Sequence, residues 1–128
     1  MNEPVSEFKS KSGLKRIMAA TGYSIAGLQA AWRHEHAFRQ ELIVGAVLTI
    51  VALLLPVSAF QKLVLVASMV LVLIVELINS AIEAVVDRVS LERHPLSKNA
   101  KDFGSAAVML AVLISCAAWA VVLYNRFW

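Results

Sequence analysis

Three acids and one amide interrupt the most apolar stretch of the chain or follow it directly. They are Glu76, Asn79, Glu83 and Asp87. On a helix with ~100° per residue, Asn79 lies at roughly −60° from Glu76, Glu83 at roughly −20° and Asp87 at roughly +20°. All four therefore share one face. Carboxylates gathered in this way can accept a proton from a substrate or bind a hard cation such as Mg²⁺.

The segment that carries these acids is one of three apolar segments, at 42–57, 63–86 and 106–124. The chain has 128 residues, 59% of them hydrophobic, and its mean hydropathy is +0.72. A soluble domain of this size could not bury so much apolar surface. Since a bilayer core of ~30 Å needs ~20 helical residues, we predict an all-α membrane protein of one domain, 1–128. The predicted transmembrane helices cover about 37–56, 62–87 and 101–124, and the first is not a cleaved signal.

The depth of the acids in the membrane follows from helical rise. If the second span starts near Lys62 on the outside, ~1.5 Å per residue places Glu76 ~21 Å and Glu83 ~31 Å across. Both then lie near the cytoplasmic edge. A carboxylate at the centre of a membrane helix costs at least ~2.5–3.5 kcal/mol, so such residues usually have a function. For Asn79 and Asp87, a structural role in joining helices or capping the helix end stays open.

Basic residues predict the orientation. Six of them occur up to Arg39 and four in the 88–101 loop, whereas the 56–62 loop and the C-terminus have one each. The positive-inside rule places the N-terminus and the 88–101 loop in the cytoplasm and the C-terminus outside.

The segment at about 8–33 has apolar residues at three- and four-residue steps, which predicts an amphipathic helix. It lies either on the cytoplasmic leaflet or against the bundle. Gly13, Gly22 and Gly27 are expected to bend or break it.

Further polar residues are expected at the cytoplasmic edge. Glu35 and Glu41 precede or open the first span, and Asp102 opens the third. Nearby bases suit phosphate binding; these are Arg16, Lys98 and Lys101. The chain has no Walker loop, no glycine-rich kinase loop and only one cysteine, Cys116. We interpret Cys116 as packing material. A kinase built from these parts would rely on carboxylates, a metal and a few bases.

The stretches ELINSAIEAVVDR at 76–88 and AKDFGSAA at 100–107 closely resemble the prokaryotic diacylglycerol kinase family. GYS at 22–24, AAW at 30–32 and EHAFRQE at 35–41 match as well, so the resemblance covers nearly the whole chain after residue 14. It implies a homotrimer of three-span protomers, each with an N-terminal surface helix, and active sites shared between chains. The implied reaction is ATP-dependent phosphorylation of diacylglycerol to phosphatidic acid, with Mg²⁺, at the cytoplasmic face of the bacterial inner membrane. No nucleic-acid partner is expected.

The resemblance also assigns roles to residues. Glu76 matches the catalytic base and Asn79 a polar residue beside it, while Glu35 and Glu83 match metal ligands. The positions that match nucleotide contacts are Arg16, Tyr23, Glu35, Glu83, Glu92, His94, Lys101 and Asp102. The positions that match lipid-substrate contacts are Arg16, Gln29, Trp32, Arg39, Glu41, Glu76, Ser105 and Trp119. The sequence departs from well-known members at Gln29, where they carry a basic residue, and in the turn at 56–61.

Three other functions fit parts of the pattern. An undecaprenol kinase of the same fold would share the acidic face but accept a polyprenol. A small oligomeric transporter or proton channel could also place a glutamate inside a helix bundle. A purely structural helix-bundle subunit would tolerate Glu83→Ala.

Overall fold

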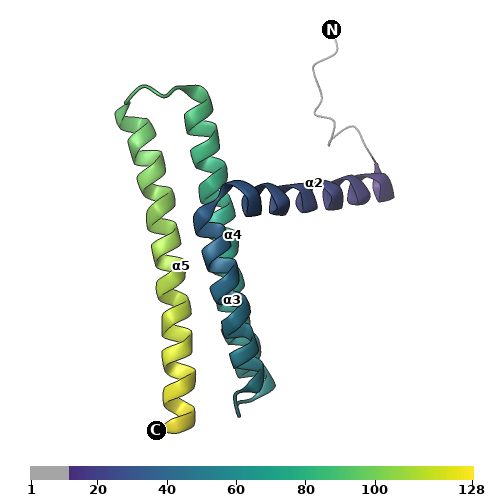
Figure 1. Cartoon of the computed structure of the whole chain (residues 1–128), viewed down its shortest axis with the longest axis vertical. Helices are drawn as coiled ribbons and strands as arrows, with labels where there is room; N and C mark the ends of the chain where they lie inside the picture. Colours follow the sequence, from purple (N-terminus) through teal and green to yellow (C-terminus); the bar gives the residue numbers. More distant parts are fainter. Residues whose placement is uncertain (1–11) are drawn as a thin grey trace. The chain divides into compact units, whose positions relative to one another are not determined.

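The computed structural model describes residues 12–128, which are helical apart from short connections (Figure 1). The helices are α2 (Gly13–His34), α3 (His36–Leu54), α4 (Ala59–Val89) and α5 (Pro95–Phe127). The chain divides into two compact units after Glu35. The first contains α2, and the second contains α3, α4 and α5. The predicted all-helical fold is confirmed for the part of the chain that the structure describes.

Three of these helices, α3, α4 and α5, are long and apolar enough to cross a membrane. Their number agrees with the three predicted spans, although the ends of the helices differ. The predictions of 62–87 and 101–124 correspond to helices that begin at Ala59 and Pro95 and end at Val89 and Phe127. Hydropathy located the apolar centre of each helix, whereas the ends are determined by capping groups that hydropathy does not detect.

The cap of α4 is a reciprocal pair formed by Ser58 and Gln61. The Gln61 backbone N–H donates to Ser58 Oγ at 3.1 Å, and the Ser58 backbone N–H donates to Gln61 Oε1 at 3.0 Å. This capping box satisfies N–H groups that have no partner inside the helix. At the start of α5, His94 Nδ1 accepts from the Leu96 N–H at 3.1 Å, and Pro95 occupies the first turn, where its missing N–H costs nothing.

Helix α2 runs without interruption through Gly22 and Gly27, so the prediction that these glycines bend or break it is wrong. A helical glycine costs only ~1 kcal/mol relative to alanine. Alanine, the strongest helix former, lies close to both positions, at 19–20 and at 26. Thr21 and Ser24 also donate their hydroxyls to carbonyls four residues earlier. Only Gly13, at the first residue of the helix, has a positive φ, of 57°. Residues 8–11 of the predicted helix lie outside the described residues.

Within the second unit, α4 packs against both α5 and α3, and α4 and α5 form a long hairpin (Figure 1). The buried residues of α4 follow one another at three- and four-residue steps, as the inner face of a helix requires. They are Leu65, Ser68, Met69, Val72, Glu76 and Asn79. Glu76 and Asn79 therefore extend the buried face of α4 toward the 90–94 loop. The outer faces of all three helices carry exposed large apolar side chains, which suit lipid or a neighbouring chain.

The end of the bundle opposite the 90–94 loop is held by two cations. Lys62 Nζ donates to the Leu53 carbonyl and Arg126 Nε to the Pro56 carbonyl, both at 2.7 Å. These bonds satisfy carbonyls at the end of α3 and in the following turn, which have no intrahelical partner. The Arg126 bond also fastens the end of α5 to the α3–α4 turn, 70 residues away in the sequence.

Candidate active site

Glu76 and Asn79 are the most deeply buried acid and amide of the second unit, with 5% and 8% of their surfaces exposed. They lie one turn apart on the inner face of α4. Residues three apart on a helix are neighbours, so the carboxylate and the carboxamide stand side by side. The acidic face predicted from the sequence is present, but the burial of its side chains decreases along the helix. Glu83 is half-buried, and Asp87, one turn further, is exposed.

Glu41 on α3 joins this pair. Its charge and that of Glu76 lie close enough to repel each other. The Glu41 Oε2 atom is buried without a hydrogen-bond partner. The structure thus brings together an acid that the resemblance assigned to catalysis and one that it assigned to the lipid. Buried acceptors of this kind call for a donor.

An apolar cavity of about 290 Å³ begins at Glu41 and extends between α3, α4 and α5. Its lining surface is almost entirely apolar; the lining residues are Gln40, Glu41, Val44, Gly45, Leu48, Met69, Val72, Val112, Ser115 and Cys116. Ser115 is one of its few polar groups, and its hydroxyl is engaged with Ser68 on α4 at 3.0 Å. Because the lining surface is apolar and the Ser115 hydroxyl already has a partner, the cavity suits a hydrocarbon chain.

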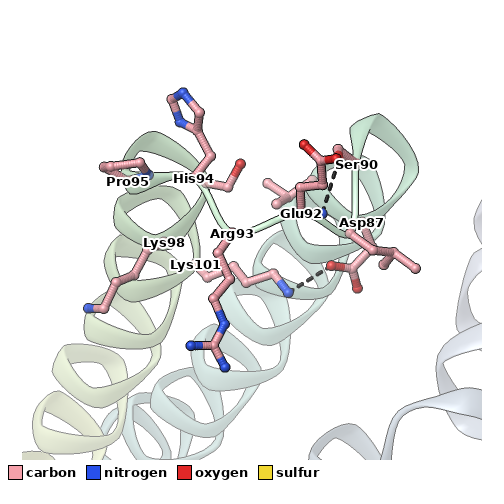
Figure 2. A pocket seen from close by; sticks show the side chains of 11 residues that line it. Asp87, Ser90, Glu92, Arg93, His94, Pro95, Lys98 and Lys101 are labelled. Carbon is pink, nitrogen blue, oxygen red and sulfur yellow. Dashed lines mark hydrogen bonds and ion pairs between the residues drawn. The ribbon is translucent and has the colours of Figure 1, made fainter.

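A second, polar pocket of about 760 Å³ lies where the 90–94 loop joins α4 to α5 (Figure 2). Of the predicted nucleotide contacts, Glu92, His94 and Lys101 line it, together with the basic residues Arg93 and Lys98. Lys101 Nζ pairs with Asp87 Oδ1 at 2.7 Å and also experiences the charge of Glu83. The ring of His94 points away from this ion pair (Figure 2). A concave site with several cations suits a phosphate chain.

Asp102, another predicted nucleotide contact, is not part of this lining. It accepts from Lys98 Nζ at 2.5 Å across one turn of α5. Both side chains are well exposed, so this pair adds little stability. Asp87, for which the sequence left a structural role open, joins α4 to α5 through Lys101.

The two predicted lipid contacts on α5 lie far apart. Ser105 is exposed near the start of the helix, whereas Trp119 follows 14 residues later, ~21 Å along the axis. Trp119 packs near the buried Ala52, Leu65 and Val122, and its Nε1–H is buried without a partner. One hydroxyl group cannot contact both residues. The predicted lipid contact Arg39 lies on α3, two residues before Glu41. Its Nη2 atom donates to His36 Nδ1 at 3.0 Å.

The remaining predicted contacts belong to the first unit. Arg16, Tyr23, Gln29 and Trp32 lie on α2, and Glu35 follows its last residue. Their roles stay predictions, and so does the pairing of Glu35 with Glu83 around a metal ion.

Among residues 12–128, no three His, Cys, Asp or Glu side chains gather as a complete set of metal ligands. Mg²⁺ does not require such a set, because it takes one or two protein carboxylates and completes its shell with water and phosphate oxygens. Glu83 has the right chemistry. It is a half-buried carboxylate between Glu76 and the polar pocket, on the same face of α4.

Sequence reasoning did not assign Gly104, Arg93 or the aliphatic lining of the cavity. Gly104 is buried on α5 directly against Asn79. A signal was available, because Gly104, Ala111, Ser115 and Val122 are small or apolar residues at helical spacing, and all four are buried. Arg93 was counted only as an orientation signal, since a loop arginine has no periodicity from which to infer a contact.

A model of the prokaryotic diacylglycerol kinase family matches residues 22–123. The chain belongs to this family. It is 58% identical to a diacylglycerol kinase of Pseudomonas aeruginosa over 118 residues, which cover 92% of this chain and 96% of the relative. A diacylglycerol kinase of Escherichia coli K12 is 47% identical over 91% of this chain and 95% of its own length. One of Haemophilus influenzae is 39% identical over 88% and 96%.

The resemblance identified from the sequence is thereby confirmed. The region that matches the diacylglycerol kinase family contains the buried pair, both cavities and every assigned residue except Arg16. Membership identifies the chain as a lipid kinase with membrane-spanning helices. It also excludes the transporter and the purely structural subunit, because the family to which the chain belongs is a family of kinases.

Proposed function

We propose that this protein transfers the γ-phosphoryl group of ATP to the primary hydroxyl of diacylglycerol, forming phosphatidic acid. One observation carries this proposal: the buried Glu76 lies on α4 between a hydrocarbon-lined cavity and a basic polar pocket. Val72, one turn before Glu76, lines the cavity, and Val86, ten residues after it, begins the polar pocket. A lipid alcohol and a water-soluble nucleotide can therefore approach the same carboxylate from opposite directions.

In the proposed reaction, Glu76 accepts the proton of the lipid hydroxyl as that oxygen attacks the γ-phosphorus. The bond between the γ-phosphorus and the β–γ bridging oxygen breaks, and ADP leaves. Asn79, beside Glu76, orients the hydroxyl or the carboxylate. Lys101 and Arg93 supply positive charge for the phosphate chain, as phosphoryl transfer requires. The acyl chains lie along the cavity, and Trp119 contacts their distal part rather than the glycerol.

Mg²⁺ bound with ATP would neutralise charge on the phosphate oxygens. Glu83, together with Glu35, would hold it. The location of Glu83 between Glu76 and the polar pocket supports this assignment. The remaining nucleotide contacts, Arg16 and Tyr23 among them, stay as the resemblance assigns them.

We further propose a homotrimer in the bacterial inner membrane, with the N-terminus and the 90–94 loop in the cytoplasm and the C-terminus in the periplasm. The distribution of basic residues supports this orientation. The large exposed apolar faces of the three helices support an assembly in lipid. Helix α2 would lie on the cytoplasmic leaflet, where ATP is present.

The decisive experiment offers diacylglycerol and undecaprenol side by side to the purified protein in mixed micelles, with radiolabelled ATP and Mg²⁺. Thin-layer separation of the lipid products measures both rates. We expect labelled phosphatidic acid, and labelled undecaprenyl phosphate at a rate at least tenfold lower. A preference for undecaprenol would replace the proposed substrate with a polyprenol, and no labelled lipid from either would refute the kinase reaction.

A further inference from the structure

Gly104 on α5 faces the Asn79 side chain on α4 at a distance that only glycine permits. A Cβ atom at position 104 would lie 2.1 Å from Asn79 Oδ1 and 3.2 Å from Asn79 Cγ. Real Cβ contacts are never as short as the first distance. The other four glycines of the chain have open space at the same position, with nothing within 4 Å. The close approach is therefore specific to the one glycine that faces the buried pair.

This contact limits where the carboxamide of Asn79 can lie. Its Oδ1 end is pressed against the backbone of α5, buried and without a hydrogen-bond partner among the described residues. A side chain this buried has few rotamers available. The amino group is the end of the carboxamide that is not held against α5, and Glu76 lies one turn away on the same face.

The same turn of α5 also connects to the polar pocket. Lys101, three residues before Gly104, pairs with Asp87 on α4. Two contacts thus set the spacing of α4 and α5 here, Lys101 with Asp87 and Gly104 with Asn79. A methyl group at position 104 must either push the helices apart, which moves Lys101, or turn the carboxamide away from Glu76.

We propose that Gly104 is a positioning residue for phosphoryl transfer, because its missing side chain lets α5 hold the Asn79 carboxamide beside Glu76. This inference rests on the proposed function, in which Asn79 acts with Glu76. It adds a requirement at a residue that would act through Asn79.

The first test is Gly104→Ala, with Gly22→Ala as the matched control, since a Cβ at Gly22 meets nothing. Misplacement of a reacting group by about 1 Å can cost on the order of a hundredfold in rate. We expect Gly104→Ala to lower kcat by about tenfold to a hundredfold, with the KM for ATP and for diacylglycerol within about twofold of wild type. Gly22→Ala should retain the wild-type kcat.

A cycle with Asn79→Ala separates positioning from simple destabilisation. Asn79→Ala removes both close atoms and leaves Asn79 Cβ, which is 3.7 Å from the added methyl, an ordinary contact. In that background, we expect Gly104→Ala to cause no further loss of kcat and to recover the thermal stability lost in the single variant. If Gly104→Ala alone does not fold, the double variant should fold with the kcat of Asn79→Ala.

Three outcomes would overturn the proposal. They are wild-type kcat in folded Gly104→Ala, additive losses of kcat in the double variant, or a double variant that does not fold. A different result tests the proposed function itself. If Asn79→Ala retains wild-type kcat while the stability cycle still shows coupling, the contact is real but the catalytic role of Asn79 is wrong.

Discussion

Replacing Glu76 by glutamine tests the proposed base with the least change in shape. The side chain is 5% exposed, and its charge repels that of Glu41. Glutamine has the same outline and no charge, so Glu76→Gln should fold like the wild type. A positioned general base contributes typically 10²–10⁴-fold to a rate. We therefore expect kcat to fall by that factor, which corresponds to ~2.7–5.4 kcal/mol of activation free energy.

Glu41→Gln is the matched comparison, because it removes the other charge of the same repelling pair. Its cavity lining and its assignment to the lipid predict a higher KM for diacylglycerol and a loss of kcat below tenfold. Phosphorylation of diacylglycerol with radiolabelled ATP, nucleotide binding and thermal stability are measured for both variants. Glu7→Gln, outside the residues that match the family, controls for the substitution itself.

The result that refutes this reasoning is specific. A Glu76→Gln protein that is folded, binds nucleotide and turns over at the wild-type rate cannot have lost its base. Equal losses of kcat in Glu76→Gln and Glu41→Gln would also contradict it, because the two acids would then contribute only their shared charge.

Three further predictions address the two cavities. Lys101→Met should lower kcat/KM for ATP by tenfold or more. Asp87→Asn breaks only a half-exposed ion pair and should change kcat/KM for ATP less than threefold. Equal losses in the two variants would mean that Lys101 acts through Asp87 alone. Ser115→Leu replaces one hydroxyl oxygen by three carbons in the lining of the 290 Å³ cavity, so the KM for diacylglycerol should rise severalfold while that for ATP stays constant. An unchanged KM for the lipid would place the acyl chains elsewhere. Cys116 lines the same cavity and is the single cysteine of the chain. A short-chain diacylglycerol should therefore slow its alkylation by a membrane-permeant maleimide, with the rate measured by mass spectrometry. An unchanged rate of alkylation would count against occupation of the cavity by the lipid.

Much of the fold follows from the sequence because lipid imposes simple rules. Three apolar segments of the right length had to become helices, since a helix satisfies its own backbone groups in hydrocarbon. The angular positions of Glu76 and Asn79 follow from the helical repeat alone, and both are buried on the inner face of α4 as that repeat requires. The helix ends were predicted less well. They depend on local bonds such as the Ser58–Gln61 cap and the His94 cap.

The site was predictable only where it follows from one helix. The 3.6-residue repeat orders Glu76, Asn79, Glu83 and Asp87 along α4, but it says nothing about which residues of α3 and α5 face them. The proximity of Glu41 to Glu76 and the contact of Gly104 with Asn79 depend on how α3 and α5 pack against α4. The glycines of α2 illustrate the opposite error. Their type suggested a break, although the neighbouring residues favour a continuous helix.

Unsatisfied polar atoms give an independent reason to place a lipid alcohol at Glu76. Buried acceptors without a donor are rare in folded proteins, and each one requires an explanation. One such acceptor in the described part of the chain, Glu41 Oε2, belongs to a residue whose charge interacts with that of Glu76, whereas Asn79 Oδ1 is held against α5. An ester carbonyl could not satisfy Glu41 Oε2, because it has no proton to donate. A free hydroxyl can donate, and the primary hydroxyl of diacylglycerol is the group that the proposed reaction consumes.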